Sequence, residues 1–323
     1  MTTTEGGIGR TEAPANVRPE VVEITGIEDL RACVDLERTI WGAGDIDLVP
    51  LNQLRAAQQA GGLVAGARLS GKLVGFSYAF PAYRPRLHNG PGLHSHLTGV
   101  LEAVRGMGVG RALKEFQRSW CLERGIGWIE WTFDPLRAAN ARFNLNHLGA
   151  AAEEYLVDVY GRLDDGLNRA LPSDRLVASW RLDDYAGAAA IAQGAAAIAQ
   201  GAADKGPVDK GPVDKGPANQ RPADPGPANQ GPADPGAPEH GVPVLTASEQ
   251  DLPGIPRLGE TADALLLAVP GDLDRLLATR PEAALRWRLA VRAAFRHYFA
   301  SGYRTTRFLD SAYLLTRRQK EPQ

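Results

Sequence analysis

Val104-Arg105-Gly106-Met107-Gly108-Val109-Gly110-Arg111 is the stretch of sequence that decides the fold. It follows an apolar run at 94–101 and opens a helix in which apolar residues recur at helical spacing. The first N–H groups of a helix have no intrahelical partner, and the helix dipole places partial positive charge there. A glycine-rich start of this kind favours a phosphate ligand, and a pyrophosphate above all. A plain tight turn is the alternative that the glycines alone leave open.

Two familiar nucleotide-binding motifs fail at this position. No Gly-Lys-Ser/Thr ending follows the glycines, so the stretch is not a Walker loop. A Rossmann fingerprint needs its third glycine three residues after the second, where Arg111 stands. The pattern therefore predicts phosphate binding without either of these folds.

Outward from this turn, the residues before position 186 alternate between strand and helix patterns in the order βααβββαβαββ. Strands are predicted at 21–24, 63–68, 73–80, 94–101, 128–133, 155–160 and 175–182. A capping box at Thr25 and Glu28 predicts a helix to about residue 40, and a second helix is predicted at 50–60. The helix after the glycines is expected to end before Gly125, and Asp134-Pro135 predicts another that runs to about residue 148. This order predicts a mixed α/β domain.

The segment 186–240 separates two parts of different composition. Its 55 residues include 16 Ala, 9 Gly and 9 Pro but no aromatic residue, and they form short imperfect repeats. Such a segment cannot bury enough apolar surface to fold, so we expect a disordered linker; a docking segment is the alternative. The predicted organisation is a disordered N-terminus at 1–18, a domain at 19–185, the linker, and a C-terminal α+β segment at 241–323.

The C-terminal segment is predicted to hold a strand at 264–269, helices at 272–279 and 281–301, and a hairpin of strands at 303–309 and 313–316. Its long helix carries one stripe of arginines, Arg288, Arg292 and Arg296. An anion-binding face is one interpretation of this stripe. A solvated face is the interpretation that we favour from the sequence.

Composition excludes several classes of protein. The 36 basic and 38 acidic residues give a formal charge of −2, which lacks the basic excess of a nucleic-acid-binding protein. Two cysteines, Cys33 and Cys121, cannot build a disulfide framework and favour a reducing compartment. No run of eighteen apolar residues occurs. We expect a soluble cytoplasmic protein that binds neither membrane nor nucleic acid.

The motif Arg105-x-x-Gly108-x-Gly110, between an apolar strand and a helix, resembles the acetyl-CoA pyrophosphate motif of the GNAT acetyltransferase superfamily. The resemblance covers the order of elements from about Val21 to Leu182. It is closest to a poorly characterised bacterial branch of predicted N-acetyltransferases, through several short motifs. These are His94-Ser95-His96, Trp131-Thr132-Phe133-Asp134-Pro135-Leu136, Asn140-Ala141-Arg142-Phe143-Asn144-Leu145, Leu148-Gly149 and Asp174-Arg175-Leu176. That branch also carries Trp287-Arg288 and Gly302-Tyr303, which implies that the C-terminal segment packs on the GNAT domain.

The resemblance implies a mixed central sheet in which the strand at 94–101 splays from the strand at 128–133. The pantetheine arm of acetyl-CoA, the expected cosubstrate, would lie in this gap and pair with the first strand. The implied cofactor-binding residues follow one another along the chain. They are Val100, Leu101, Arg105, Gly106, Met107, Gly108, Val109, Gly110 and Arg111.

Three candidates for the base that deprotonates an amine lie on or beside this strand. The period of two places His94, His96 and Thr98 on one face, and a histidine can take up a proton near neutral pH. The two histidines could instead form internal hydrogen bonds or bind a metal, although no third ligand is identifiable and we expect no metal. Glu102, just beyond the strand, is the third candidate base, with a plain surface role as its alternative.

The proton donor that the resemblance implies is absent from this chain. The resemblance places a tyrosine four residues before Gly149, where this chain has Leu145. His147, Tyr155 or water are the substitutes that the sequence offers. This departure keeps open two alternatives to an enzyme: a non-catalytic sensor or recruitment module that binds acyl-CoA, and a protein with a structural role only.

The acceptor is expected to be a small-molecule amine. Candidates to line its pocket are Tyr78, Tyr83, Arg84, Arg86 and Trp131, and the arginines point to a carboxylated substrate, although aromatic residues at strand spacing are more often core. The sequence also allows a homodimer. The predicted function is acetyl transfer from acetyl-CoA to this amine by direct attack.

Overall fold

The structure, a computed structural model, describes residues 18–42, 48–85, 87–88, 90–161, 171–182 and 240–317. The predicted N-terminal tail and linker lie outside the described residues, except for Arg18 and His240. The two domain boundaries beside the linker therefore stay predictions.

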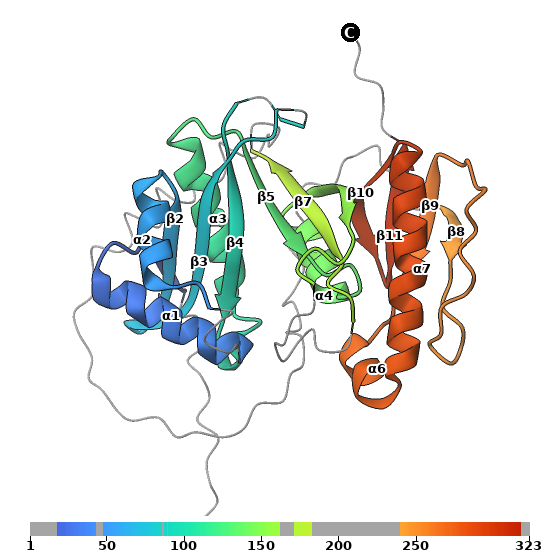
Figure 1. The fold of residues 1–323 in the computed structure, drawn as a ribbon, viewed down its shortest axis with the longest axis horizontal. Coiled ribbons are helices and arrows are strands. Elements are labelled where there is room, and N and C mark those ends of the chain that lie inside the picture. The colour runs from blue at the N-terminus through green and yellow to red at the C-terminus, as the bar shows by residue number, and fades with distance from the viewer. Residues whose placement is uncertain are drawn as a thin grey trace, which may run out of the picture.

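The strands of the described residues form a single mixed sheet (Figure 1). Its members are β1 (Glu20–Glu23), β2 (Leu63–Leu69), β3 (Lys72–Ala82), β4 (Gly92–Val100), β5 (Trp128–Phe133), β6 (Ala151–Leu156), β7 (Arg175–Arg181), β8 (Val242–Leu245), β9 (Ala264–Ala268), β10 (Tyr303–Leu309) and β11 (Ala312–Arg317). They lie in the order β1-β2-β3-β4-β5-β7-β6-β10-β11-β9-β8. The pairs β4–β5 and β8–β9 are parallel and the others antiparallel. The predicted mixed α/β fold is confirmed.

The helices cover both faces of this sheet. They are α1 (Ile27–Trp41), α2 (Leu51–Gln59), α3 (Val109–Leu122), α4 (Ala138–Ala141), the π-helix η2 (Arg142–His147), α6 (Leu273–Thr279) and α7 (Pro281–Ala300), with a 3₁₀ turn η1 at Glu102–Val104. Side chains of α1 and α2 form one core with Phe76 and Tyr78 of β3. A second, continuous core joins α3 to α7 through the other face of the sheet.

Three local predictions are corrected by the structure. The N-cap of α1 is Gly26, and no side chain caps the first turn of the helix. Thr25 therefore does not form the predicted capping box. Asp134 does not cap a long helix: its carboxylate accepts from the Leu136 N–H at 2.9 Å, and a short α4 followed by the π-helix replaces the continuous helix. The sixth strand begins at Ala151, four residues before the predicted start, and β8 was not predicted.

The C-terminal segment extends the sheet of the preceding domain, because β10 pairs with β6 through Thr305 and Ala152. Asn146 of η2 makes two hydrogen bonds with the Phe308 backbone, at 2.7 and 2.9 Å. The Tyr155 ring of β6 stacks on Phe295 of α7 with ring centroids 5.7 Å apart. The expected packing of this segment on the domain is therefore built from sheet, π-helix and core contacts together.

Two arginines of α7 form ion pairs across the same interface. Arg288, which is 1% exposed, donates to Asp134 at the end of β5 at 2.7 Å. Arg292 makes a bidentate pair with Asp174, at 2.7 and 2.8 Å. Only Arg296 of the predicted stripe is exposed. The favoured interpretation of a solvated arginine stripe is wrong for Arg288 and Arg292, because both form ion pairs inside the protein. Their partners lie more than a hundred residues away in sequence, so local spacing could not reveal them.

We expect Asp134→Ala to lower the free energy of unfolding by about 3–5 kcal/mol, because it leaves the Arg288 guanidinium buried and uncompensated. The double variant Asp134→Leu/Arg288→Met should recover part of this loss, since it buries no unpaired charge. Urea unfolding followed by circular dichroism measures both. Arg296→Met on the same helix is the control, with an expected change within about 0.5 kcal/mol. A loss below 1 kcal/mol for Asp134→Ala would contradict the stabilising role of this pair.

Candidate functional site

The glycine-rich turn forms the N-terminus of α3. Gly106 and Gly108 have φ values of 80° and 79°, a left-handed conformation that favours glycine, and Gly108 is the N-cap. The first intrahelical hydrogen bond runs from the Ala112 N–H to the Gly108 carbonyl. The N–H groups of residues 109–111 precede it, so they and the helix dipole offer an anion-binding site.

Gly110 has no conformational reason to be glycine. Its φ is not positive, and a Cβ added there would meet only Val100 Cγ2 at 3.8 Å, which is ordinary contact. The missing side chain instead leaves open space in front of the helix N-terminus and beside the end of β4. Such a space fits a ligand that approaches the backbone closely.

Basic side chains stand near this turn. Burial lowers the pKa of His147 on η2, and the nearby charges of Arg111 and Arg142 lower it further. These three residues therefore share one electrostatic environment beside the N-terminus of α3. Arg105 Nε donates to the Val100 carbonyl at 3.5 Å, so this arginine borders the end of β4.

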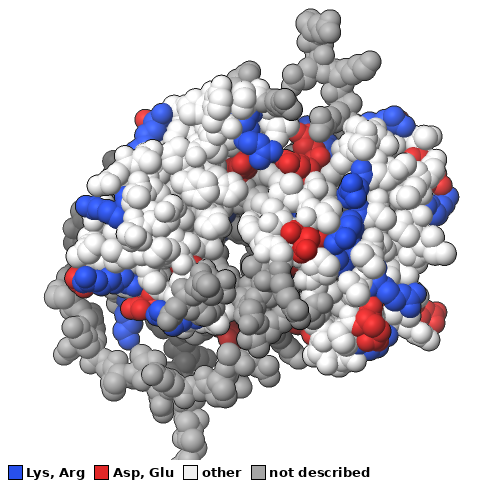
Figure 2. All heavy atoms as spheres, viewed as in Figure 1, with Lys and Arg blue, Asp and Glu red and all other residues white. Residues whose placement is uncertain are grey.

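The strands β4 and β5 separate soon after they meet. Their pairing comprises Leu93 with Ile129 and His94 with Glu130, and no pair follows on either strand. In Figure 1 the two strands diverge from this point, while α3 lies behind them. Figure 2 shows the surface hollowed between the part that carries α1 and α2 and the part that carries α7. The splayed strand pair that the resemblance implies is present.

A β-bulge interrupts β4 at His96. Ser95 pairs with Ala79 and Leu97 with Tyr78, so His96 is the extra residue of the bulge. Beyond it, the alternation of faces is reversed, and Thr98 pairs with Ser77 on the α3 side of the sheet. The expectation that His94, His96 and Thr98 share one face is therefore wrong for Thr98.

His94 and His96 lie together on the face of β4 that α1 and α2 cover, which we call the acceptor face. Both rings contact Phe80, at centroid distances of 5.0 and 5.7 Å, and they lie 6.1 Å from each other. Partial burial lowers the pKa of His96, and the neighbouring His94 lowers it further. His96 keeps enough exposed surface to meet a substrate.

Glu130 of β5 completes a charged cluster on the acceptor face. Its Oε1 lies 3.3 Å from His94 Nδ1 and 3.4 Å from Arg84, which also pairs with Glu154. Burial raises the pKa of Glu130, but the His94 hydrogen bond and the Arg84 charge outweigh burial and leave it below its usual value. Its Oε2 is buried without a hydrogen-bond partner. Glu130 was not predicted as a site residue, although an acidic residue within the apolar run Trp-Ile-Glu-Trp-Thr-Phe is a usable signal.

The α3 side of the fork holds a second polar cluster, which surrounds Lys114. Its Nζ donates to Ser95 Oγ at 2.8 Å and lies 3.9 Å from the centroid of the Trp131 ring. Trp131 Nε1 donates to Asn144 of η2 at 3.2 Å. Burial lowers the pKa of Lys114 to about 7. Trp131 therefore faces α3 and does not line the acceptor face.

The remaining predicted residues are scattered. Glu102 is exposed on η1, at the opposite end of β4 from His94, and is not brought together with the histidines. The Tyr155 hydroxyl donates to Asp174 at 2.7 Å within the α7 interface, so its proton is engaged away from the fork. Tyr83 is 75% exposed, Tyr78 is buried, and Arg86 lies outside the described residues.

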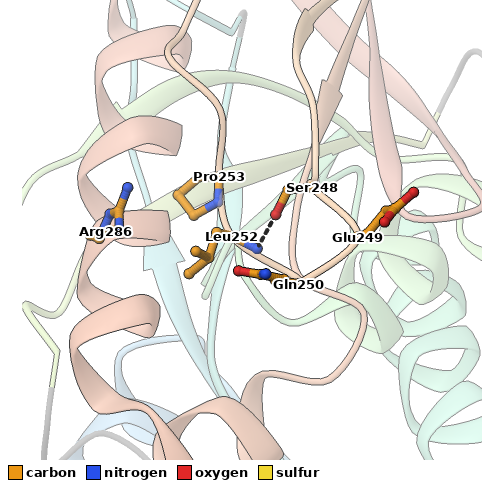
Figure 3. A pocket seen from close by; sticks show the side chains of 6 residues that line it. All are labelled: Ser248, Glu249, Gln250, Leu252, Pro253 and Arg286. Atoms are coloured by element: carbon orange, nitrogen blue, oxygen red, sulfur yellow. Dashed lines mark hydrogen bonds between the residues drawn. The ribbon is translucent and has the colours of Figure 1, made fainter.

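A separate depression lies on the C-terminal segment. It measures about 510 Å³ and is lined by Ser248, Glu249, Gln250, Leu252, Pro253 and Arg286 (Figure 3). The Leu252 N–H donates to Ser248 Oγ, so part of its polar lining is satisfied internally. It contains none of the residues at the fork or the glycine turn.

In the described part of the chain, no group of three or more His, Cys, Asp or Glu side chains is placed to hold a metal ion. None of the helices described combines the length and the apolar composition needed to cross a membrane.

Comparison with known proteins identifies a family for part of the chain. Residues 30–149 match the model of the acetyltransferase (GNAT) family. No curated protein matches the chain.

Several solved structures are similar to about half of the chain. A ribosomal-protein-alanine N-acetyltransferase from Brucella melitensis is 21% identical over 50% of this chain and 99% of its own, with a TM-score of 0.39. The putative acetyltransferase yncA from Salmonella typhimurium, solved with its cofactor acetyl-CoA, is 18% identical over 53% and 97%, with a TM-score of 0.40. An N-acetyltransferase from Staphylococcus aureus is 14% identical over 51% and 99%, with a TM-score of 0.40.

The two glycines of the turn should respond differently to substitution. Gly108→Ala is expected to cost about 1–2 kcal/mol of stability, because a side chain disfavours its left-handed conformation. Gly110→Ala should leave stability unchanged or raise it by up to about 1 kcal/mol, as alanine is the better helix residue. Chemical unfolding of both variants measures the difference. Equal losses at the two positions would mean that Gly110 is required by the fold.

Proposed function

We propose that this chain, whose residues 30–149 match the acetyltransferase (GNAT) family model, transfers the acetyl group of acetyl-CoA to an amine of a small substrate by direct attack. The observation that carries this proposal is the combination of a forked β4–β5 pair with an anion-binding turn at one end of the fork. The turn would bind a phosphate, and the fork leaves a strand edge open beside it.

Acetyl-CoA fits this combination in charge and in length. Its pyrophosphate would bind the N–H groups of residues 108–111, because the Met107 N–H already donates to the Val104 carbonyl, and its pantetheine arm would lie along the open edge of β4, past Leu101 and Val100. From Val100 back to Ser95, β4 spans about 16 Å at ~3.3 Å per residue. An extended arm has about 13 bonds between phosphorus and sulfur, which also covers roughly 16 Å at ordinary bond lengths. The thioester would therefore arrive near the point where β4 and β5 separate.

The acceptor face supplies a base and an amine-binding group beside that point. His96, whose pKa is lowered, is largely neutral near pH 7 and can accept the proton of an incoming ammonium. His94 is the alternative base, and Glu130 orients it through their hydrogen bond. Glu102 stays a weaker candidate because it lies at the other end of the strand. The bulge leaves the His96 backbone unpaired in the ladder, where its N–H can stabilise a developing oxyanion.

The charge of the cluster favours a cationic acceptor over the carboxylated one that the arginines suggested. Arg84 is already paired with Glu130 and Glu154, so its charge is compensated inside the protein. Glu130 Oε2, in contrast, is a buried acceptor without a partner. A primary ammonium supplies the donors that this oxygen lacks, which supports an amine that arrives protonated.

Gly110→Glu should abolish acetyl-CoA binding, because a carboxylate would occupy the space proposed for the pyrophosphate. Calorimetry of the parent, Gly110→Glu and Gly110→Ala measures this effect, and circular dichroism checks that all three fold. The parent should also consume acetyl-CoA in the presence of a panel of amines. Equal affinity of parent and Gly110→Glu would refute this binding site, and binding without turnover would favour a sensor or recruitment module.

Replacement of the proposed base should change the rate with little effect on cofactor affinity. For the parent, kcat/KM should rise with pH through an apparent pKa below the usual ~6.5 of histidine, since the base must be neutral and the pKa of His96 is lowered. His96→Ala should lose about 10²-fold in kcat/KM. His94→Ala and Glu102→Gln are the comparisons. If His96→Ala keeps the parent rate and pH profile, another group is the base.

A further inference from the structure

We propose that Lys114 donates the proton that the departing CoA thiolate requires, so that this chain uses a buried lysine as its general acid. The inference rests on the proposed acetyl transfer and adds a residue to it. Lys114 lies at the fork of the sheet, on the side opposite the acceptor face.

Lys114 occupies the apex of the fork. The last paired positions of β4 and β5 are His94 and Glu130, so Ser95 and Trp131 are the first residues on each strand after the pairing ends. Lys114 contacts both of them, the first by a hydrogen bond and the second over the ring face. A thioester that reaches the apex along β4 would therefore lie next to the Lys114 amine.

Among the described residues, the surroundings of Lys114 provide no permanent counter-charge. The groups that face it are Ser95 from β4, Trp131 from β5 and Gln117 from its own helix, and none of these side chains is ionised. Cys121, one of the groups with a resolved influence on it, has its own pKa raised to about 12 by burial and is neutral near pH 7. Lys114 is 3% exposed, so its charged form is energetically costly until an anion forms beside it. A nascent thiolate is such an anion.

The proton balance of the reaction supports this assignment. The acceptor ammonium gives one proton to the base on the acceptor face and a second to solvent as its nitrogen forms the amide bond, and the C–S bond breaks with its electron pair on sulfur. The Lys114 ammonium then protonates that sulfur, so that CoA leaves as the thiol. The neutral Lys114 amine regains its proton from solvent. Burial lowers the pKa of Lys114 to about 7, where a lysine can exchange protons near neutral pH. Leu145, at the position of the implied tyrosine, has no proton to give.

The test compares three variants with the parent in acetyl transfer to an amine. Lys114→Met should lower kcat by about 10²-fold, keep acetyl-CoA affinity within a few-fold, and remove the fall of kcat at alkaline pH. Lys114→Arg keeps the charge but cannot release its proton, so its kcat should also stay low. Lys72→Met, on the exposed β2–β3 hairpin, should match the parent. Full activity of either Lys114 variant would overturn the proposal.

A second measurement does not depend on turnover. In protein labelled at lysine Cε, the Lys114 resonance is the one that Lys114→Met lacks, and its titration can be followed by NMR. Bound CoA should raise the pKa of Lys114 relative to desulfo-CoA, which has the same pyrophosphate but no sulfur. The same titration in both complexes would show that Lys114 does not meet the sulfur. A parent that shows this difference without turnover would contradict the proposed function but support the placement of Lys114.

Discussion

The separation of β4 from β5 after two paired positions is the constraint on which the rest of the structure depends. It leaves two strand edges without partners in the middle of a sheet, where unpaired N–H and C=O groups are costly. Side chains fill the space around the fork on both of its faces. A polar cluster around Lys114 fills the apex from the α3 side, while His94 and Glu130 pair across it on the acceptor face. The open edge of β4 that remains is the natural place for an extended ligand.

The C-terminal segment holds the β5 half of the fork in place. Asp134 at the end of β5 pairs with Arg288, and Asn146 of the π-helix binds the backbone of β10. The same π-helix carries His147, which shares an electrostatic environment with Arg111 of the glycine turn, and Asn144, which binds Trp131. The segment is therefore connected to the candidate site through one layer of residues, and not merely attached to the domain.

The sequence predicted those features that depend on local patterns. Period-two and helical spacings predicted most strands and helices, and the glycine turn together with several other motifs resembled the GNAT family, whose model matches residues 30–149. Features that depend on distant partners were missed. The bulge at His96 reversed the face of Thr98, and Arg288 was taken as solvated because Asp134 lies 154 residues away. Lys114 shares the buried side of α3 with Gln117 and Cys121, but a single lysine in an amphipathic helix is normally read as exposed.

The long separation between interface partners also bears on how the chain is made. When β6 leaves the ribosome, the Arg288 that pairs with Asp134 is still about 130 residues from synthesis, and the neighbouring strand β10 about 150. At ~5–20 residues per second, that interval is on the order of ten seconds or more. Throughout it, the apolar surface of β6 that α7 later covers faces the solvent or a chaperone. Asp134, at the end of β5, can gain its Arg288 partner only once α7 has been made, so we expect the proposed acetyl transfer to require α7.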